Sequence, residues 1–124
     1  MWMVFLGGGL GSMLRYLISR LFAQYSAASL PWATFFSNIL GCVILAVLIA
    51  LSKEKIANSN FLYLLLVTGF CGGLSTFSTF SYETLQLFKQ ELYIYAILNI
   101  LISMGVGMFS IYYLLFKLTT HEII

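Results

Sequence analysis

Three long stretches of the chain carry no charged residue, and they constrain the fold more than any other feature. They run from Leu21 to Ser52, from Ile56 to Tyr82 and from Leu92 to Phe116. Each is longer than the ~20 mostly apolar residues that one membrane-spanning helix needs. Only 8% of the 124 residues are charged and 61% are hydrophobic, whereas an ordinary soluble domain is about one quarter charged. We therefore expect the chain to face lipid.

The first uncharged stretch is too long for one helix and divides near its middle. Residues 24–31, QYSAASLP, hold the polar and proline signals of a connection. Pro31 would open the next helix, where its missing N–H costs nothing. The residues ahead of the connection are apolar apart from Arg15 and Arg20. We expect one all-α domain with four transmembrane helices per subunit, at about 2–23, 32–52, 60–88 and 92–117.

The remaining polar groups leave little room for catalysis. The chain has no aspartate, and its single histidine, His121, lies in the polar tail. Cys42 and Cys71 both fall inside expected spans, where small buried apolar residues are the simplest interpretation. No lysine or arginine precedes Arg15, so the chain does not begin like a cleaved signal peptide. We expect no enzyme, and a net charge of +2 gives no case for nucleic acid.

Positive charges divide almost evenly between the two sides of a four-span topology. One side carries Lys53, Lys55 and Lys117, and the other carries Arg20 and Lys89, with Arg15 deeper. Because lysine and arginine bias in short loops sets orientation, near balance predicts a chain that inserts either way up. A weak bias decided by one residue or by the lipid is the alternative that the counts leave open. Insertion both ways would permit an antiparallel homodimer with a two-fold axis in the membrane plane.

All ten glycines lie inside the expected helices. Gly7 with Gly11, and Gly69 with Gly73, have the spacing that lets helix backbones approach closely, and packing alone accounts for most of them. The segment 69–83, GFCGGLSTFSTFSYE, differs because adjacent glycines are followed by several hydroxyl residues. Such a stretch weakens a helix and is tolerated in a membrane only where it is buried or lines a wet cavity. Since broken helices are a recurring device for binding ions, we expect a break in the third helix.

Phe77 and Phe80 are three residues apart and so share one helix face. The rim of a phenyl ring is electropositive, so rings turned edge-on toward a cavity would favour a small anion. Plain packing is an equally open interpretation. Asn38 lies inside the second span, where an unpaired amide is costly. A pore role and an interhelical hydrogen bond are equally open for it.

Three motifs together resemble one known family. GGGLGSMLRY at 7–16, PWATFFSNILG at 31–41 and GFCGGLSTFSTFSYE at 69–83 are similar to the CrcB/Fluc family of fluoride channels, and the likeness extends over essentially the whole chain. It implies a four-helix subunit, a dual-topology antiparallel homodimer with two fluoride pores, and a central structural sodium ion. It also implies a multi-pass protein of the bacterial inner membrane, whose other partners are fluoride and lipid. Its function would be passive export of toxic cytoplasmic fluoride.

The resemblance also assigns roles to individual residues. Gly72 and Ser75 match the break whose backbone carbonyls hold the sodium, although the family usually has threonine where this chain has Ser75. Ala33 stands where a glycine is usual, which bears on local packing. Asn99 and Ser103 resemble a polar track in the fourth helix. The expected fluoride pore is lined by Asn38, Phe77, Phe80, Thr34, Ser78, Thr79 and Ser103, and the expected vestibule residues are Arg15 and Glu83.

Two other functions are weighed against the channel. A small dual-topology multidrug exporter needs an acid embedded in its first helix to exchange protons for drug, and residues 2–23 contain none. A lipid-modifying or assembly protein would need a nucleophile with a base, or several carboxylates, within the spans. The sequence shows no such constellation, so the channel is the preferred interpretation and the exporter is the alternative.

Overall fold

The computed structural model describes residues 1–25, 30–51 and 60–120, and every regular element within them is a helix. Four helical rods cross the molecule, as expected from the sequence, and their ends fall within a few residues of the expected ranges. The third rod consists of four consecutive pieces. The elements are α1 (Trp2–Tyr25), α2 (Trp32–Leu51), α3 (Asn60–Leu62), η1 (Tyr63–Cys71), α4 (Gly72–Leu74), α5 (Phe77–Lys89) and α6 (Tyr93–Thr120).

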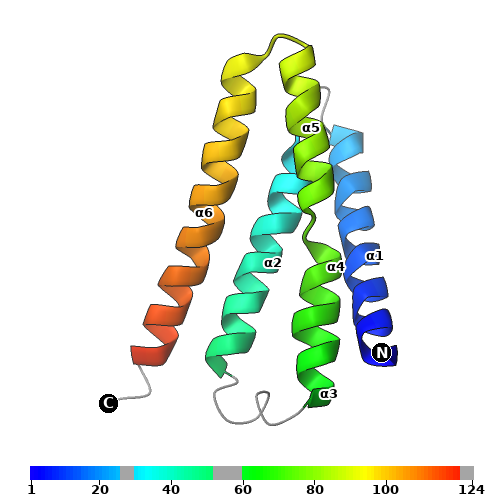
Figure 1. Cartoon of the computed structure of the whole chain (residues 1–124), viewed down its shortest axis with the longest axis vertical. Coiled ribbons are helices and arrows are strands. Elements are labelled where there is room, and N and C mark those ends of the chain that lie inside the picture. The colour runs from blue at the N-terminus through cyan, green and yellow to red at the C-terminus, as the bar shows by residue number, and fades with distance from the viewer. Residues whose placement is uncertain (26–29, 52–59, 121–124) are drawn as a thin grey trace.

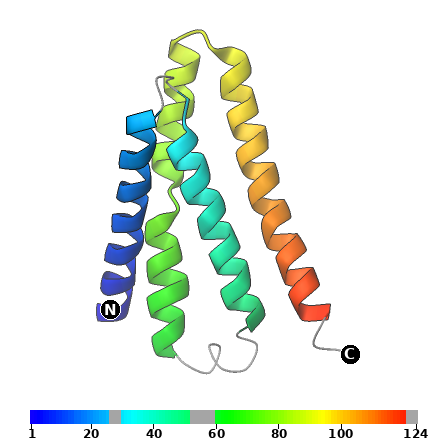
Figure 2. The same ribbon diagram turned by 180° about the vertical axis from the view of Figure 1, so that it is seen from behind.

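The rods run alternately up and down (Figure 1, Figure 2). The beginning of α1, the end of α2, the beginning of α3 and the end of α6 therefore lie at one end of the molecule. At the other end, two backbone hydrogen bonds form the turn after α5. Leu92 N donates to Leu87 O at 2.9 Å, and Glu91 N donates to Phe88 O at 3.1 Å. Glu91 has φ 60°, the left-handed conformation that ends many helices. This tight turn sends α6 back alongside α2.

Apolar side chains are widely exposed on the outer faces of the rods. On α6, for example, Leu101, Phe109 and Phe116 are 64%, 63% and 62% exposed. Three segments are long and apolar enough to cross a membrane, namely Trp32–Ala50, Tyr63–Lys89 and Tyr93–Leu118. The helix α1 has the expected place and length but is not among them, because Arg15, Arg20 and its glycines lower its apolar character. Exposed apolar faces of this extent are typical of a surface that contacts lipid or another protein.

α1 packs against η1 and α4 through backbone contacts. A Cβ atom on Gly7 would collide with the Leu65 carbonyl oxygen, and one on Gly11 would collide with the Phe70 carbonyl oxygen. From the other side, a Cβ on Gly73 would collide with the Gly8 carbonyl oxygen. Only hydrogen fits at these three positions, so the expectation that these glycines serve packing is confirmed. We call this contact, made by Gly7, Gly8, Gly11, Gly69 and Gly73, the glycine interface.

η1 is a π-helix of nine residues, Tyr63–Cys71. Its wider turn, with i→i+5 hydrogen bonds, is rare and occurs mostly as single turns inside α-helices. The sequence did not lead us to expect it. The π-helix contributes the Leu65 and Phe70 carbonyls that lie against α1, so it forms much of the glycine interface.

Some sequence predictions fall outside the described residues. These are Lys53 and Lys55 in the second connection, His121 in the tail, and residues 26–29 of the first connection. The near balance of positive charge between the two sides therefore stays a prediction.

Candidate functional site

The third rod loses its helical conformation at two residues. α4 ends at Leu74, and α5 begins at Phe77. Between them Ser75 has φ −81° and ψ 153°, and Thr76 has φ −150° and ψ 121°, both extended. These residues, which we call the extended pair, form the thin link between α4 and α5 (Figure 1) and lie inside the candidate span Tyr63–Lys89. Backbone groups on both sides of the pair lose their helical partners.

Asn38 of α2 replaces part of the lost helical bonding. In a continuous helix the Thr76 N–H would donate to the Gly72 carbonyl. Here Thr76 N donates to Asn38 Oδ1 at 2.7 Å, and Asn38 Nδ2 donates to Thr76 O at 3.2 Å. The amide thus satisfies both backbone groups of one residue. The interhelical hydrogen bond, one of the two interpretations of Asn38, is confirmed.

Arg15 and Ser12 of α1 supply partners on the other side of the pair. The Gly73 carbonyl would accept from Phe77 N if the helix continued. Arg15 Nε instead donates to Gly73 O at 3.1 Å, and Ser12 Oγ lies 3.4 Å from the same oxygen. Arg15 is half-buried. The sequence had indicated neither this contact nor the involvement of Ser12.

The hydroxyl groups of the extended pair cap the two helix ends. Ser75 Oγ donates to the Cys71 carbonyl at 2.9 Å, so it folds back on the preceding turn. Thr76 Oγ1 accepts from Thr79 N at 3.2 Å, and its hydroxyl donates to Thr79 Oγ1 at 3.1 Å. This is the usual N-cap arrangement, in which a side-chain oxygen binds a free N–H of the first helical turn. α5 therefore begins in a fixed place, directly before Phe77.

An open groove of about 310 Å³ lies beside the extended pair. We call it the polar groove, and its lining residues are Asn38, Cys42, Ser75, Thr76, Phe77, Phe80, Ser103 and Met104. All of these residue types are uncharged. The Phe77 and Phe80 rings are 6.1 Å apart between centroids, with their planes at 38°. Phe77 is 80% exposed, so within this chain its ring is not core packing.

The structure gathers some of the expected pore residues and separates others. Asn38, Phe77, Phe80 and Ser103 all line the polar groove, together with Ser75. Among the residues that line it, Cys42, Thr76 and Met104 were not expected pore residues. Thr76 belongs to the hydroxyl-rich segment 69–83, whereas Cys42 and Met104 gave no sequence signal of their own. The expected residues outside the lining are Thr34, Ser78, Thr79, Arg15, Glu83 and Gly72.

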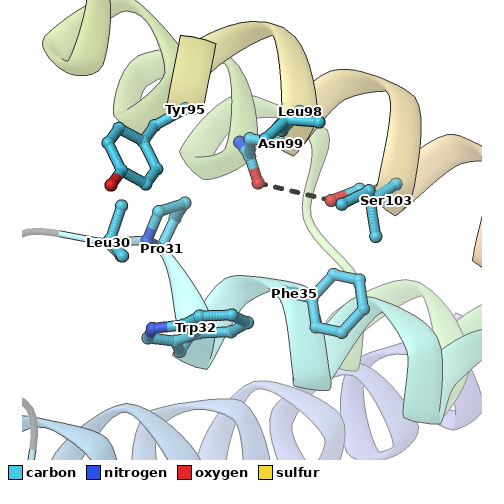
Figure 3. Close-up of a pocket in the computed structure, with 9 residues that line it drawn as sticks. Leu30, Pro31, Trp32, Phe35, Tyr95, Leu98, Asn99 and Ser103 are labelled. Carbon is cyan, nitrogen blue, oxygen red and sulfur yellow. Dashed lines mark hydrogen bonds between the residues drawn. The ribbon is translucent and has the colours of Figure 1, made fainter. Parts of the chain in front are cut away.

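A short chain of hydrogen bonds connects α6 to α5. Ser103 Oγ donates to Asn99 Oδ1 at 3.3 Å (Figure 3), and Asn99 Nδ2 donates to Thr84 Oγ1 at 2.8 Å. The Thr84 hydroxyl in turn donates to the Phe80 carbonyl at 2.8 Å. Asn99 and Ser103 thus share a face, as their spacing predicts. Thr84 was missed, although threonine four residues after a carbonyl often bonds back to it.

A second cavity, of about 220 Å³, lies between the first turns of α2 and α6 (Figure 3). Aliphatic and aromatic side chains dominate its lining, with Asn99 and Ser103 as the polar members. Ser103 lines both this cavity and the polar groove. The residues around the cavity are Leu30, Pro31, Trp32, Phe35, Tyr95, Leu98, Asn99, Ile102 and Ser103.

Thr34 and Glu83 pair between α2 and α5, away from the groove lining. Thr34 is only 5% exposed and forms a hydrogen bond with the Glu83 side chain. The other Glu83 oxygen, Oε2, and the Ser37 hydroxyl are buried among the described residues without a hydrogen-bond partner. Ser37 had not been singled out in the sequence, because a lone serine in a span gives no signal.

Side-chain metal ligands are not clustered in the described part of the chain. Residues 1–25, 30–51 and 60–120 contain no group of three or more His, Cys, Asp or Glu that could hold a metal ion. Both cysteines are free thiols. A cation at this site would need backbone carbonyl oxygens, which suit hard ions such as sodium, magnesium or calcium.

Comparison with known proteins identifies the family. The family described as "CrcB-like protein, Camphor Resistance (CrcB)" matches residues 2–114. A protein of Phocaeicola vulgatus named "Fluoride-specific ion channel FluC" is 47% identical over 91 residues, which cover 73% of this chain and 74% of the relative. A protein of the same name from Flavobacterium psychrophilum is 40% identical over 105 residues, covering 85% of each chain.

A third relative is similar to this chain to about the same extent as the second. "Fluoride-specific ion channel FluC 1" of Streptomyces avermitilis is 39% identical over 108 residues, covering 86% of each chain. The three alignments span most of both partners, so the likeness concerns the whole four-helix unit and not one motif. With three apolar segments long enough to span a membrane, this multi-pass membrane protein belongs to the CrcB family.

Proposed function

We propose that the chain forms a fluoride-specific ion channel, which lets fluoride leave the cytoplasm passively through the bacterial inner membrane and so protects the cell from fluoride. The observation that carries the proposal is the neutral polar groove beside the extended pair, in a chain whose relatives are named fluoride channels. The multidrug exporter gains no support, because α1 holds no acidic residue and the relatives carry a different name.

The chemistry of the groove suits a small anion. Asn38 has two amide N–H donors, and one of them is used on the Thr76 carbonyl. The second is left to donate to an anion in the groove. The edges of the Phe77 and Phe80 rings add weak electropositive contacts. Fluoride is small and strongly hydrated, so several such contacts are needed to replace its water. Neutral contacts also let the ion leave, as conduction requires.

Hydroxyl groups extend this path beyond the groove. Ser103 lies on the α6 face that carries Asn99, and it borders both cavities. We place the remaining pore residues, Thr34, Ser78 and Thr79, further along the same route, with Arg15 and Glu83 toward its ends. Glu83 hydrogen-bonds Thr34, so these two residues lie together on this route.

A structural sodium ion at the extended pair is part of the proposal, with the Gly72 and Ser75 carbonyls as ligands. The backbone supports it in two ways. The Gly72 carbonyl has lost its helical donor, because Thr76 N binds Asn38 instead. Gly72 is also exposed, and a Cβ atom there would meet open space. The carbonyls of Cys71, Gly73 and Thr76 already accept hydrogen bonds. A sodium ion would supply positive charge for the Gly72 and Ser75 carbonyl oxygens.

The proposed assembly is an antiparallel homodimer of chains inserted in both orientations. Support comes from the exposed apolar faces of α1 and α6 and from Gly72 and Gly105, where a Cβ atom would meet nothing within 4 Å. Two copies related by an axis in the membrane plane would bring two sets of Gly72 and Ser75 carbonyls together. Such a pair would complete the coordination of one ion.

Fluoride efflux from proteoliposomes tests the proposed function. Vesicles loaded with potassium fluoride and containing the purified protein should release fluoride to an external electrode when valinomycin is added. Parallel vesicles loaded with potassium chloride should release almost no chloride. Protein-containing vesicles that hold their fluoride as tightly as empty ones would refute the channel.

Orientation and sodium are tested separately. A tag at the C-terminus should be accessible to a membrane-impermeant label from both sides of the cell membrane, and accessibility from one side only would refute dual topology. Replacing all sodium in the purification buffers by N-methylglucamine should weaken the dimer, so that gel filtration shows a smaller dimer fraction. An unchanged dimer without sodium would refute the structural ion.

A further inference from the structure

Two side chains from different helices hold the extended pair at its two edges. At its C-terminal side, which we call the far edge, Asn38 of α2 binds both backbone groups of Thr76. At its N-terminal side, which we call the near edge, Arg15 of α1 donates from Nε to the Gly73 carbonyl, with Ser12 close to the same oxygen. The resemblance to the family suggested a vestibule position for Arg15, and the geometry gives it a specific backbone partner.

The Gly73 carbonyl needs such a partner. It is one of the last carbonyls of α4, which have no partner within the helix, and within a membrane a free backbone group is costly. Arg15 Nε supplies the donor that this carbonyl needs.

Close packing places Arg15 within reach. Gly73 contacts Gly8 so tightly that a side chain at Gly73 would collide with the Gly8 carbonyl. Gly11, one turn before Arg15, meets Phe70 and Leu74 backbone atoms in the same way. α1 therefore lies directly against the end of α4, and a residue one turn beyond Gly11 faces the Gly73 carbonyl. The glycine interface sets the register of this contact.

We infer that Arg15 is a positioning residue: its Nε hydrogen bond to the Gly73 carbonyl fixes the near edge of the extended pair, as Asn38 fixes the far edge. This inference rests on the proposed function and adds to it. The Gly73–Leu74 peptide lies one residue before Ser75, so its orientation limits where the Ser75 carbonyl and the Thr76 cap lie. Phe77 follows the cap, so its ring position depends on both edges.

The inference distinguishes hydrogen bonding from charge. A residue that attracted the anion would act through its positive charge and would tolerate lysine but not glutamine. A residue that orients Gly73 acts through a donor, which glutamine supplies without charge. Methionine supplies neither but keeps a long unbranched side chain. The series Arg15→Lys, Arg15→Gln and Arg15→Met therefore separates the two roles.

The test measures fluoride efflux and amide hydrogen exchange on the same dimeric preparations. Arg15→Met should lower efflux about tenfold and speed exchange of the Thr76 amide about tenfold, since one donor to the segment is lost. Arg15→Gln and Arg15→Lys should both recover most of the efflux and of the protection. Ser12→Ala, which removes the longer contact, should have a smaller effect on both. Arg20→Met is the matched control, because Arg20 is an exposed arginine of the same helix, and it should change neither.

Three outcomes would overturn the inference. Efflux that is normal in Arg15→Lys but equally low in Arg15→Gln and Arg15→Met would assign the role to charge. Unchanged Thr76 exchange in Arg15→Met would show that Arg15 does not hold the segment. Efflux equal to wild type throughout the series would show that the contact between Arg15 and Gly73 does not affect conduction. If Arg15→Met fails to assemble, the lysine and glutamine variants still decide between donor and charge. If the wild type passes no fluoride, the proposed function fails, and the exchange measurement alone decides whether Arg15 holds the pair.

Discussion

In the glycine interface the backbones of α1, η1 and α4 touch, whereas in the polar groove side chains of α2, α5 and α6 stand between the helices. Gly7, Gly11 and Gly73 leave no space for even a methyl group. The groove, by contrast, is an open volume of about 310 Å³ lined by uncharged side chains. In membranes helix association depends on close packing and on interhelical polar contacts, because lipid is as apolar as the side chains. The glycine interface depends on close packing, whereas the polar groove depends on interhelical polar contacts.

The extended pair lies where these regions meet. Its near edge is bound from the glycine side, by Arg15 at Gly73. Its far edge is bound from the groove side, by Asn38 at Thr76. A tight contact on one side gives a fixed support, and an open groove on the other side leaves room for an ion. Substitutions in the groove should therefore change flux more than stability, and substitutions in the glycine interface should do the reverse.

The largest expected effect is on flux, from Asn38→Asp. The carboxylate loses the Nδ2 donor to Thr76 O and places negative charge in the groove. The lost donor and the added negative charge act together. We expect fluoride efflux to fall about a hundredfold, which corresponds to about 2.7 kcal/mol. Gln90→Glu is the control, because it makes the same amide-to-acid change at an exposed residue after α5. Efflux from Asn38→Asp vesicles within a factor of two of the control would remove Asn38 from the pore.

The next effect is on stability, from Gly11→Ala. The new methyl group would collide with the Phe70 carbonyl oxygen, so α1 must move away from η1. Overpacking of this kind costs about 1–3 kcal/mol, and we expect a clear drop in the detergent concentration at which half of the protein is unfolded. Gly9→Ala is the control, since a Cβ at Gly9 meets nothing within 4 Å. Equal midpoints for the two variants would contradict the close contact that defines the glycine interface.

The sequence predicted the parts of this fold that depend on local composition. Uncharged stretches located the helices, and the glycine and hydroxyl content of 69–83 drew attention to the segment that holds the extended pair. It could not predict η1, since a π-turn has no distinct local pattern and depends on how Leu65 and Phe70 carbonyls lie against α1. It also could not name the partner of Asn38. An amide in a span must be paired, but which residue it meets depends on the register of α2 against α5.

The site depends more on tertiary contacts than the helices do. Phe77 and Phe80 lie close together, as their spacing of three residues predicts. Their position beside Asn38 depends on the register of α2 against α5, and only the resemblance to the family led us to expect it. Thr34 instead pairs with Glu83, and the Arg15 contact with Gly73 was not foreseen. Both depend on which face of one helix meets which turn of another. The resemblance to the family supplied expected roles but no contacts.

A smaller effect on flux is expected from Phe80→Ile. Isoleucine fills similar space but has no ring edge to face an anion, so we expect efflux to fall about tenfold while the unfolding midpoint stays close to wild type. Phe61→Ile is the control, because Phe61 is an exposed phenylalanine of α3, remote from the groove lining. A large loss of stability with normal efflux would place Phe80 in packing, which was the other interpretation of this pair.

The smallest effect is expected from Thr76→Ala, which removes the cap of α5 but keeps the backbone bonds to Asn38. The lost hydroxyl leaves Thr79 N and Thr79 Oγ1 without their partner, and N-cap removal costs about 1 kcal/mol. We expect a small decrease in the unfolding midpoint and a decrease in efflux of about fivefold, because Phe77 starts from this cap. Thr76→Ser keeps the capping oxygen and should restore both the unfolding midpoint and the efflux.

If serine restores the midpoint but not the efflux, the Thr76 methyl group and not the cap sets the position of Phe77. In that case the two edges of the extended pair would differ in kind, with hydrogen bonds holding the Gly73 side and side-chain packing holding the Phe77 side.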